Sequence, residues 1–264
     1  MSSLFRFQNL SNQGGVNHFV STRIGGLSLP PYESLNLGFH VGDVHETVLK
    51  NRERLSATIQ MPLPGFTFAK QIHSNTVTVV TAQMRGRGTV DYDTAVEATD
   101  AMVTSVPGLC LTVLTADCVP VLLFDPRNRV VAAVHAGWRG SVKLIARNTV
   151  EILIQEFNCK PRDLLVGIGP SIGPCHYEIG HDVIAQVKDA FGGTDGYINV
   201  ELSSGKGYFN LWEANRRQIM DVGIPPQNIE VARICTYCDA HRFFSVRHQK
   251  GTTGRFGAGI MLST

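Results

Sequence analysis

Residues 109–136 read LCLTVLTADCVPVLLFDPRNRVVAAVHA and hold three apolar runs in close succession. The runs are Leu109–Leu114, Val119–Phe124 and Val130–Val134. Short runs rich in valine and leucine, separated by turn residues, are typical of strands. Asp125-Pro126-Arg127-Asn128 supplies a turn between the second and third runs. We therefore expect three strands here, and the polar residues at their ends are candidates for a functional site.

The flanking sequence predicts helices and strands in no strict order. An apolar stripe at helical spacing predicts a helix over residues 141–157. Further helices are expected over residues 45–60, 181–191 and 211–222, and further strands over 16–22, 77–80, 164–168, 229–234, 243–246 and 258–262. Because regular strand–helix–strand alternation is missing, the pattern favours an α+β or layered α/β fold with mixed sheets over a doubly wound fold.

Composition places the chain among ordinary globular proteins. Of its 264 residues, 43% are hydrophobic and 17% are charged, which is enough to build a sizeable core. The net charge of +2 is too small to indicate a nucleic-acid partner. No apolar run reaches the ~18 residues of a membrane span, and Met1–Phe7 lacks a signal core. We therefore expect no membrane partner and a cytoplasmic location; the sequence does not indicate the oligomeric state.

Three metal-capable side chains stand in segments that suit a fixed site: His73, Cys118 and His135. Two imidazoles and a thiolate give a tetrahedral ion three protein ligands and leave a fourth position open, as in catalytic zinc sites. Their spacings of 45 and 17 residues match no local zinc motif, so the site depends on convergence in space. Copper is the alternative metal, since it binds the same ligand types more tightly.

The residues beside these candidate ligands suggest further roles. Arg139 follows His135 at the start of the predicted helix, where free N–H groups and a guanidinium suit an anion. Asp117 interrupts an apolar stretch, and as a buried acid it would orient a ligating histidine or transfer a proton; a plain turn former is the alternative. Cys118 is either a ligand only or also a thiolate nucleophile activated by His135. Arg23 precedes two glycines in either an anion-binding turn or an ordinary one.

The other cysteines indicate no second site by themselves. Six cysteines in a chain of this length do not form a disulfide framework, and we interpret Cys110 and Cys159 as packing residues. Cys235-Thr236-Tyr237-Cys238 could bind zinc, act as a redox pair or line a site, but a structural zinc site usually needs a second such pair, and none is present. Cys175-His176 offers adjacent ligands, which rarely converge on one ion, so we expect it at most to line a site.

An ordered set of motifs resembles the YfiH family, also called the laccase-domain or polyphenol-oxidase-like family. The motifs are Leu35–Gly38 with His40–Asp43, Gln71-x-His73, Thr115–Pro120, His135–Gly140, Gly169–Gly173 and Thr253–Arg255. They span the chain from about Ser21 to Leu262, so we expect a single domain over residues 1–264. One position departs from the pattern: members often carry two arginines where this chain has Arg247-His248, which weakens position 248 as an anion contact.

The resemblance implies a layered α/β/β/α fold of the cytotoxic-necrotising-factor/YfiH type and zinc at His73, Cys118 and His135. It implies that adenosine, inosine and methylthioadenosine react with phosphate to give the base and a ribose 1-phosphate, and that adenosine is deaminated at the same site. The expected catalytic residues are Cys118, Asp117 and His135, and the expected substrate-binding residues are Asn36, His40, Gln71, Arg23, Arg139 and Arg247, the three arginines as phosphate contacts.

Three alternative functions remain open at this point. Some family members are named peptidoglycan editing factors, which implies an amidohydrolase acting on a serine-containing muramyl nucleotide. A copper polyphenol oxidase is the second, although the nine histidines include no His-x-His pair of the kind that multicopper oxidases use. A zinc-binding module without catalytic activity is the third.

Overall fold

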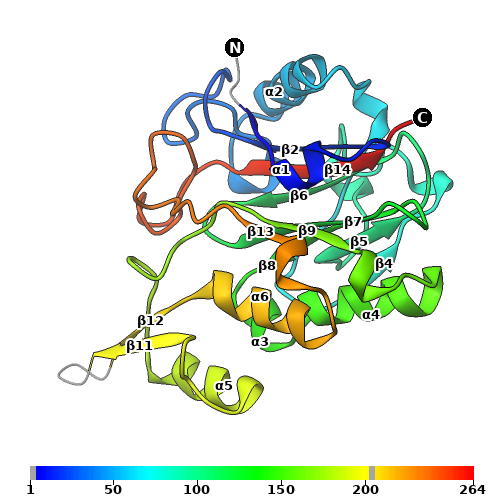
Figure 1. Cartoon of the computed structure of the whole chain (residues 1–264). Helices are drawn as coiled ribbons and strands as arrows, with labels where there is room; N and C mark the ends of the chain where they lie inside the picture. Colours follow the sequence, from blue (N-terminus) through cyan, green and yellow to red (C-terminus); the bar gives the residue numbers. More distant parts are fainter. Residues whose placement is uncertain (1–3, 202–205) are drawn as a thin grey trace.

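The stretch that holds the three central apolar runs divides between two stacked sheets. The computed structural model describes residues 4–201 and 206–264. Strand β6 (Cys110–Thr115) belongs to a five-stranded sheet, whereas β7 (Val119–Asp125) and β8 (Val130–Ala136) belong to a six-stranded sheet. The three strands are therefore confirmed, and the short connection between β6 and β7 carries the chain from one sheet to the other (Figure 1).

Both large sheets are mixed. The five-stranded sheet has the order β1-β2-β14-β6-β3, with β1 at Leu4–Phe5, β2 at Val16–Ser21, β14 at Phe256–Leu262 and β3 at Phe66–Phe68. The six-stranded sheet has the order β13-β9-β7-β8-β5-β4, with β13 at Ile229–Val231, β9 at Leu165–Ile168, β5 at Ala101–Thr104 and β4 at Val77–Val79. The edge pairs β3–β6, β4–β5 and β13–β9 are parallel. The edge pair β1–β2 and the central pairs are antiparallel.

Side-chain alternation along the strands produces three layers of core. On β7, Leu122 and Phe124 point into the space between the sheets, whereas Val121 and Leu123 point to the opposite face. Helices α4 (Ile145–Phe157) and α6 (Leu211–Asp221) cover that second face, and α2 (His45–Thr58) covers the outer face of the five-stranded sheet. Figure 1 shows the resulting α/β/β/α order of layers. The predicted layered α+β fold is confirmed.

A smaller unit stands beside these layers. Strands β10 (Glu178–Ile179), β12 (Lys206–Phe209) and β11 (Ile198–Glu201) form a three-stranded antiparallel sheet, next to α5 (His181–Phe191). This unit projects to one side of the molecule in Figure 1. Helix α1 (Gln8–Ser11) packs near β2 and β9. In the described residues, no helix is long and apolar enough to cross a membrane.

Two sequence-based expectations were wrong in detail. The helix expected over residues 141–157 is divided into α3 (Trp138–Val142) and α4, because Leu144 adopts a left-handed conformation with φ of 62°. Residues 243–246 form no strand but part of a chain of turns. Phe243 and Phe244 are nevertheless fully buried in the core between the two large sheets. Their apolar character therefore reflects packing and not strand pairing.

Candidate metal centre and adjoining cavity

Cys118 lies where the chain crosses between the two large sheets. β6 ends at Thr115 and β7 begins at Val119, so residues 116–118 make the connection. Asp117 adopts a left-handed conformation there, with φ of 89°. The Thr115 hydroxyl donates to the Cys118 carbonyl oxygen at 2.5 Å and so closes the turn. This tight crossing brings the Cys118 thiol within reach of the end of β8.

His135 is fixed at the end of β8 by Asp100. The pairing of Ala101 with Val134 places Asp100 beside His135, which is only 3% exposed. His135 Nδ1 lies 2.9 Å from Asp100 Oδ1. A carboxylate on Nδ1 holds the proton there and leaves Nε2 as the ligand atom, an arrangement common for metal-binding histidines.

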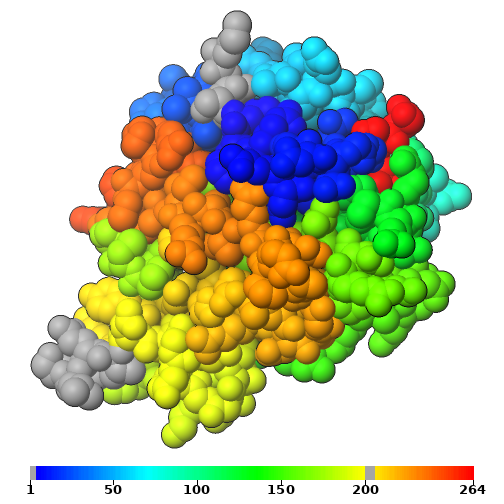
Figure 2. Space-filling view, viewed as in Figure 1, coloured from blue at the N-terminus to red at the C-terminus, as the bar shows by residue number. Residues whose placement is uncertain are grey.

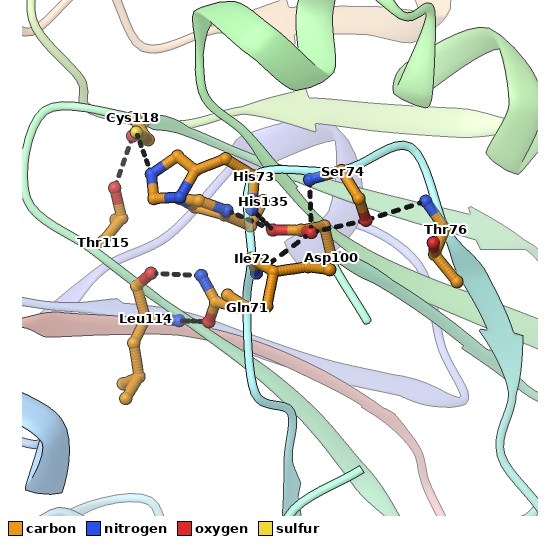
Figure 3. A network of polar contacts seen from close by, with 10 residues as sticks. All are labelled: Gln71, Ile72, His73, Ser74, Thr76, Asp100, Leu114, Thr115, Cys118 and His135. Atoms are coloured by element: carbon orange, nitrogen blue, oxygen red, sulfur yellow. Dashed lines mark hydrogen bonds and ion pairs between the residues drawn. The ribbon is translucent and has the colours of Figure 1, made fainter. Parts of the chain in front are cut away.

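The same carboxylate holds the loop that carries His73. His73 has a φ of 60°, a conformation that costs a residue other than glycine on the order of 1–3 kcal/mol. The N–H groups of Ile72, His73 and Ser74 donate to Asp100 at 3.2, 3.0 and 2.7 Å. Successive N–H groups that converge on an anion form a nest, and this nest stabilises the left-handed turn. Asp100 thus orients both histidines at once (Figure 3).

The three predicted ligands converge. The candidate ligand atoms of His73, Cys118 and His135 all lie within 4.8 Å of one another, and Cys118 Sγ is 3.9 Å from His73 Nε2. A Cβ atom on Gly137 would lie 2.9 Å from Cys118 Sγ and 3.0 Å from the His73 ring. The glycine therefore leaves the space that the converging ligands require. One thiolate and two imidazoles in this arrangement fit a tetrahedral zinc ion with one position left open.

Electrostatics favour the ligand-competent form of Cys118. Burial opposes its ionisation, but His135 and His73 outweigh burial and lower the pKa of Cys118 to about 6. Burial also disfavours a charged His135, yet Cys118 and Asp100 raise the pKa of His135 to about 9. Burial would raise the pKa of Asp100, but hydrogen bonds from His135 and Ser74 lower it to about 2. A thiolate is thus available for a metal at neutral pH.

A cavity of about 740 Å³ opens directly over these ligands. That volume lies within the range of small-molecule sites. Three cationic side chains line it: Arg247, Lys250 and Arg255. His40 and Tyr177 line it as well. Burial and the charge of Arg255 lower the pKa of His40 to about 4, so His40 is neutral at pH 7, and burial raises the pKa of Tyr177, which keeps its hydroxyl protonated.

The structure brings only some of the predicted substrate-binding residues to this cavity. His40, Gln71 and Arg247 line it. Gln71 is bound on both sides by the Leu114 backbone, since its amide donates to the carbonyl oxygen and accepts from the N–H, each at 2.8 Å. Its side chain therefore supports the wall of the cavity, whereas His40 and Arg247 keep groups that can face a ligand.

Arg23, Asn36 and Arg139 lie outside the lining. The Arg23 guanidinium donates to the carbonyl oxygens of Glu33 and Ala240 at 2.7 and 2.9 Å, so it fastens two loops together. Asn36 is fully buried and accepts the Arg255 N–H at 2.9 Å, which positions Arg255. Arg139 is exposed and stacks on the Trp138 ring at 4.4 Å.

Asp117 lines the cavity but orients the opposite wall. Its carboxylate accepts the Thr236 hydroxyl and the Arg247 N–H, each at 2.7 Å. The acid that contacts a histidine ligand is Asp100, which the sequence-based interpretation missed together with Lys250, Arg255 and Tyr177. Asp100 directly precedes the buried strand β5, and an acid at such a strand end was the available signal.

One serine motif has no catalytic geometry. Gly169–Gly173 fits the Gly-x-Ser-x-Gly pattern of serine hydrolases. Ser171 is fully buried, however, and its hydroxyl accepts a hydrogen bond from the Trp212 indole at 2.6 Å. Ser171 is therefore a packing residue and offers no exposed nucleophile.

Comparison with known proteins gives full-length similarity. The family model described as multi-copper polyphenol oxidoreductase laccase matches residues 17–263. A purine nucleoside phosphorylase of Bacteroides thetaiotaomicron is 36% identical, covering 97% of this chain and 95% of the relative. Adenosine deaminase RL5, from an unidentified prokaryote, is 33% identical, covering 93% and 94%. The crystal structure of YlmD from Geobacillus stearothermophilus superposes with a TM-score of 0.92 at 35% identity, covering 98% and 94% of the two chains.

Proposed function

Because the chain belongs to the laccase-domain family of YfiH- and YlmD-type purine nucleoside phosphorylases, we propose that it is a zinc-dependent purine nucleoside phosphorylase that also deaminates adenosine. The proposed substrates are adenosine, inosine and methylthioadenosine together with phosphate. The observation that carries this proposal is the juxtaposition of the His73, Cys118 and His135 cluster with a cavity lined by cationic side chains.

The cavity offers separate chemistry for the two substrates. Arg247, Lys250 and Arg255 give the lining a positive charge that suits phosphate. Apolar groups, among them Leu114, Ile172 and Val246, suit a purine ring. Cationic and apolar groups in one cavity would hold phosphate beside the sugar of a bound nucleoside.

The residues of the chain would share the work of binding and proton handling. His73, Cys118 and His135 would hold the zinc ion, which when bound supplies a Lewis acid at the cavity. Arg255 and its neighbours would orient phosphate for attack on the sugar carbon. Neutral His40 and the protonated Tyr177 hydroxyl, which both line the cavity, would donate hydrogen bonds to a departing base. Copper remains the alternative metal for the same ligands.

Deamination is a second activity that one relative favours directly, because RL5 is named an adenosine deaminase and matches nearly the whole chain. The oxidase function suggested by the family description has less support. Among the described residues, the clusters of three or more candidate ligands contain three histidines in all. That number falls short of the histidine-rich copper centres that oxygen reduction requires.

The test is incubation of the purified protein with adenosine, with and without phosphate. We expect adenine and ribose 1-phosphate only when phosphate is present, and inosine with ammonia in either case. His73→Ala should abolish both activities, while His241→Ala, an exposed histidine outside the cavity lining, should keep them. Full turnover by His73→Ala would contradict the metal-dependent proposal. Serine release from a muramyl nucleotide without nucleoside turnover would favour the editing function, and no turnover of either a non-catalytic module.

A further inference from the structure

A second group of metal-capable side chains lies apart from the first. It consists of Cys175, His176, Cys235 and Cys238, whose ligand atoms all lie within 4.8 Å of one another. From the sequence, Cys175-His176 was expected at most to line a site, and Cys235 and Cys238 lacked a second Cys-x-x-Cys pair. The structure joins them, because the chain after β9 and the chain after β13 run side by side. In Figure 2, the orange segment that follows β13 lies against the yellow-green segment that follows β9.

We propose that Cys175, His176, Cys235 and Cys238 bind a structural zinc ion, separate from the ion at His73, Cys118 and His135. Three thiolates and one imidazole form a closed ligand set of the kind found in structural zinc sites. Such sites keep no position for substrate. This proposal does not depend on the reaction assigned to the cavity.

The distances suit one tetrahedral ion. Zinc–sulfur bonds of about 2.3 Å and zinc–nitrogen bonds of about 2.0 Å place tetrahedral ligand atoms roughly 3.5–3.8 Å apart. Cys175 Sγ lies 3.7 Å from Cys238 Sγ, and Cys238 Sγ lies 3.3 Å from His176 Nδ1. Small shifts of exposed side chains would complete the geometry, because Cys175 and Cys238 are both exposed.

Adjacent residues rarely bind the same ion, but a tight turn allows Cys175 and His176 to do so. The N–H groups of His176 and Tyr177 both donate to the Gly173 carbonyl oxygen at 3.0 Å, which forms a tight turn. This turn directs Cys175 and His176 toward the same place. The His176 ring also stacks on Tyr237 at 4.1 Å, and this contact fixes the ring with Nδ1 toward Cys238.

Cys235, the buried member of the group, accepts a backbone hydrogen bond at its sulfur. Cys235 is only 8% exposed, and its sulfur accepts the Gly173 N–H at 3.2 Å. A Cβ atom on Gly173 would lie 3.2 Å from the Cys235 Cβ and 2.7 Å from the Trp212 ring, so the close approach requires glycine. Backbone N–H groups that donate to sulfur stabilise metal-bound thiolates.

This zinc ion would fasten one wall of the cavity. Tyr177 follows His176 directly, and the Arg247 guanidinium donates to the Glu178 carbonyl oxygen at 3.2 Å. On the other segment, Thr236 donates to Asp117 at 2.7 Å. The four ligands therefore connect the two loops that carry the cationic and aromatic side chains of that wall.

The test is metal content in a background that lacks the first site. His73→Ala/Cys118→Ala protein should retain one zinc ion per chain after dialysis against a weak chelator. Adding Cys175→Ser and Cys238→Ser should remove that ion, whereas adding His241→Ala, an exposed histidine of the same segment, should not. Replacement by Co²⁺ should give an intense sulfur-to-cobalt charge-transfer band that these serine substitutions abolish.

Several outcomes would overturn the proposal. One is a His73→Ala/Cys118→Ala protein that binds neither zinc nor cobalt. Another is bound metal that survives the serine substitutions. A third is a disulfide between Cys175 and Cys238, seen as resistance to alkylation until a reductant is added, even with zinc present. If the serine variants fail to fold, His176→Ala supplies the second measurement, because loss of the imidazole should shift the cobalt spectrum and weaken zinc in chelator competition.

Discussion

Asp100 contacts His135 through a 2.9 Å hydrogen bond, although 35 positions separate the two residues in the sequence. The same carboxylate accepts the His73 N–H at 3.0 Å. One buried acid therefore determines the ring orientation of one candidate ligand and the backbone conformation of another. Because both ligands depend on it, the geometry of the centre should respond to Asp100 more than to Asp117, the acid that lines the cavity.

We expect Asp100→Asn to weaken metal binding by His73, Cys118 and His135. An amide cannot accept all the hydrogen bonds that Ile72, His73, Ser74 and His135 now donate. Loss of such a supporting contact typically lowers metal affinity by about 10–100-fold. Competition with a chromogenic chelator would measure the zinc affinity. The protein should also carry Cys175→Ser and Cys238→Ser, so that only the cluster of His73, Cys118 and His135 contributes to the measurement.

Asp117→Asn is the matched control for that measurement. Asp117 accepts hydrogen bonds from Thr236 and Arg247 and none from a candidate ligand. The zinc affinity of the Asp117→Asn protein should therefore stay close to that of the parent protein. Equal losses in the two variants would show that Asp100 has no special role in orienting the ligands.

Gly137→Ala tests whether free space at the ligands is required. The backbone of Gly137 has φ of −70°, which alanine adopts without strain. The added methyl group would lie 2.9 Å from Cys118 Sγ, and overpacking of this kind costs about 1–3 kcal/mol, or roughly five- to 150-fold in affinity. Without metal, the Cys118 and His73 side chains can turn away from the new methyl group, whereas bound metal holds them against it. Zinc affinity should therefore fall by more than the urea unfolding free energy of the metal-free protein. Gly14→Ala, where nothing lies within 4 Å of the new methyl group, should leave affinity unchanged.

The sequence predicted strands β2, β6, β7, β8 and β14 and the three ligand candidates, because residue type and periodicity are local properties, but it did not predict β5 or the sheet of β10, β11 and β12. It did not predict that Asp100 would accompany His135, since that contact follows from the register of β5 on β8, which sequence alone does not fix. The second cluster was missed for the same reason: Cys175 and Cys238 meet only through the pairing of Ser171 with Cys235. Arg23 and Arg139 were chosen by residue type and sequence position, and neither of them lines the cavity. The single-domain organisation stays a prediction.

Arg255→Gln should separate the two proposed reactions. Arg255 lines the cavity, and loss of a hydrogen bond to a charged group costs about 1.5–3 kcal/mol, so the KM for phosphate should rise roughly ten- to 150-fold. Deamination consumes no phosphate and should change much less. Steady-state assays of both reactions would measure the difference. Arg139→Gln changes an exposed side chain outside the lining and should leave the KM for phosphate unaltered. If the KM for phosphate rises in Arg139→Gln and not in Arg255→Gln, phosphate binds at Arg139 and not at Arg255.

His18 should make the fold less stable in mild acid. His18 is 2% exposed, and its Nε2 accepts the Phe7 N–H at 2.8 Å, which requires the neutral ring. Burial and nearby Arg6 lower the pKa of His18 from 6.5 to about 4. Above pH 6.5 the ring is neutral in both folded and unfolded chains, so its contribution is fully present. Between pH 6.5 and 4 only the unfolded chain binds the proton, and stability is lost.

The predicted loss between pH 7 and 5 is roughly 2 kcal/mol of unfolding free energy from this one residue. Urea unfolding of the metal-free protein at the two pH values would measure it. His18→Gln keeps an acceptor for the Phe7 N–H but has no proton to gain, so its unfolding free energy should fall less over the same interval. His241→Ala removes an exposed imidazole and should retain the full dependence. If His18→Gln and the parent protein lose equal stability, the acid sensitivity arises at other groups, and the buried His18 ring is not its source.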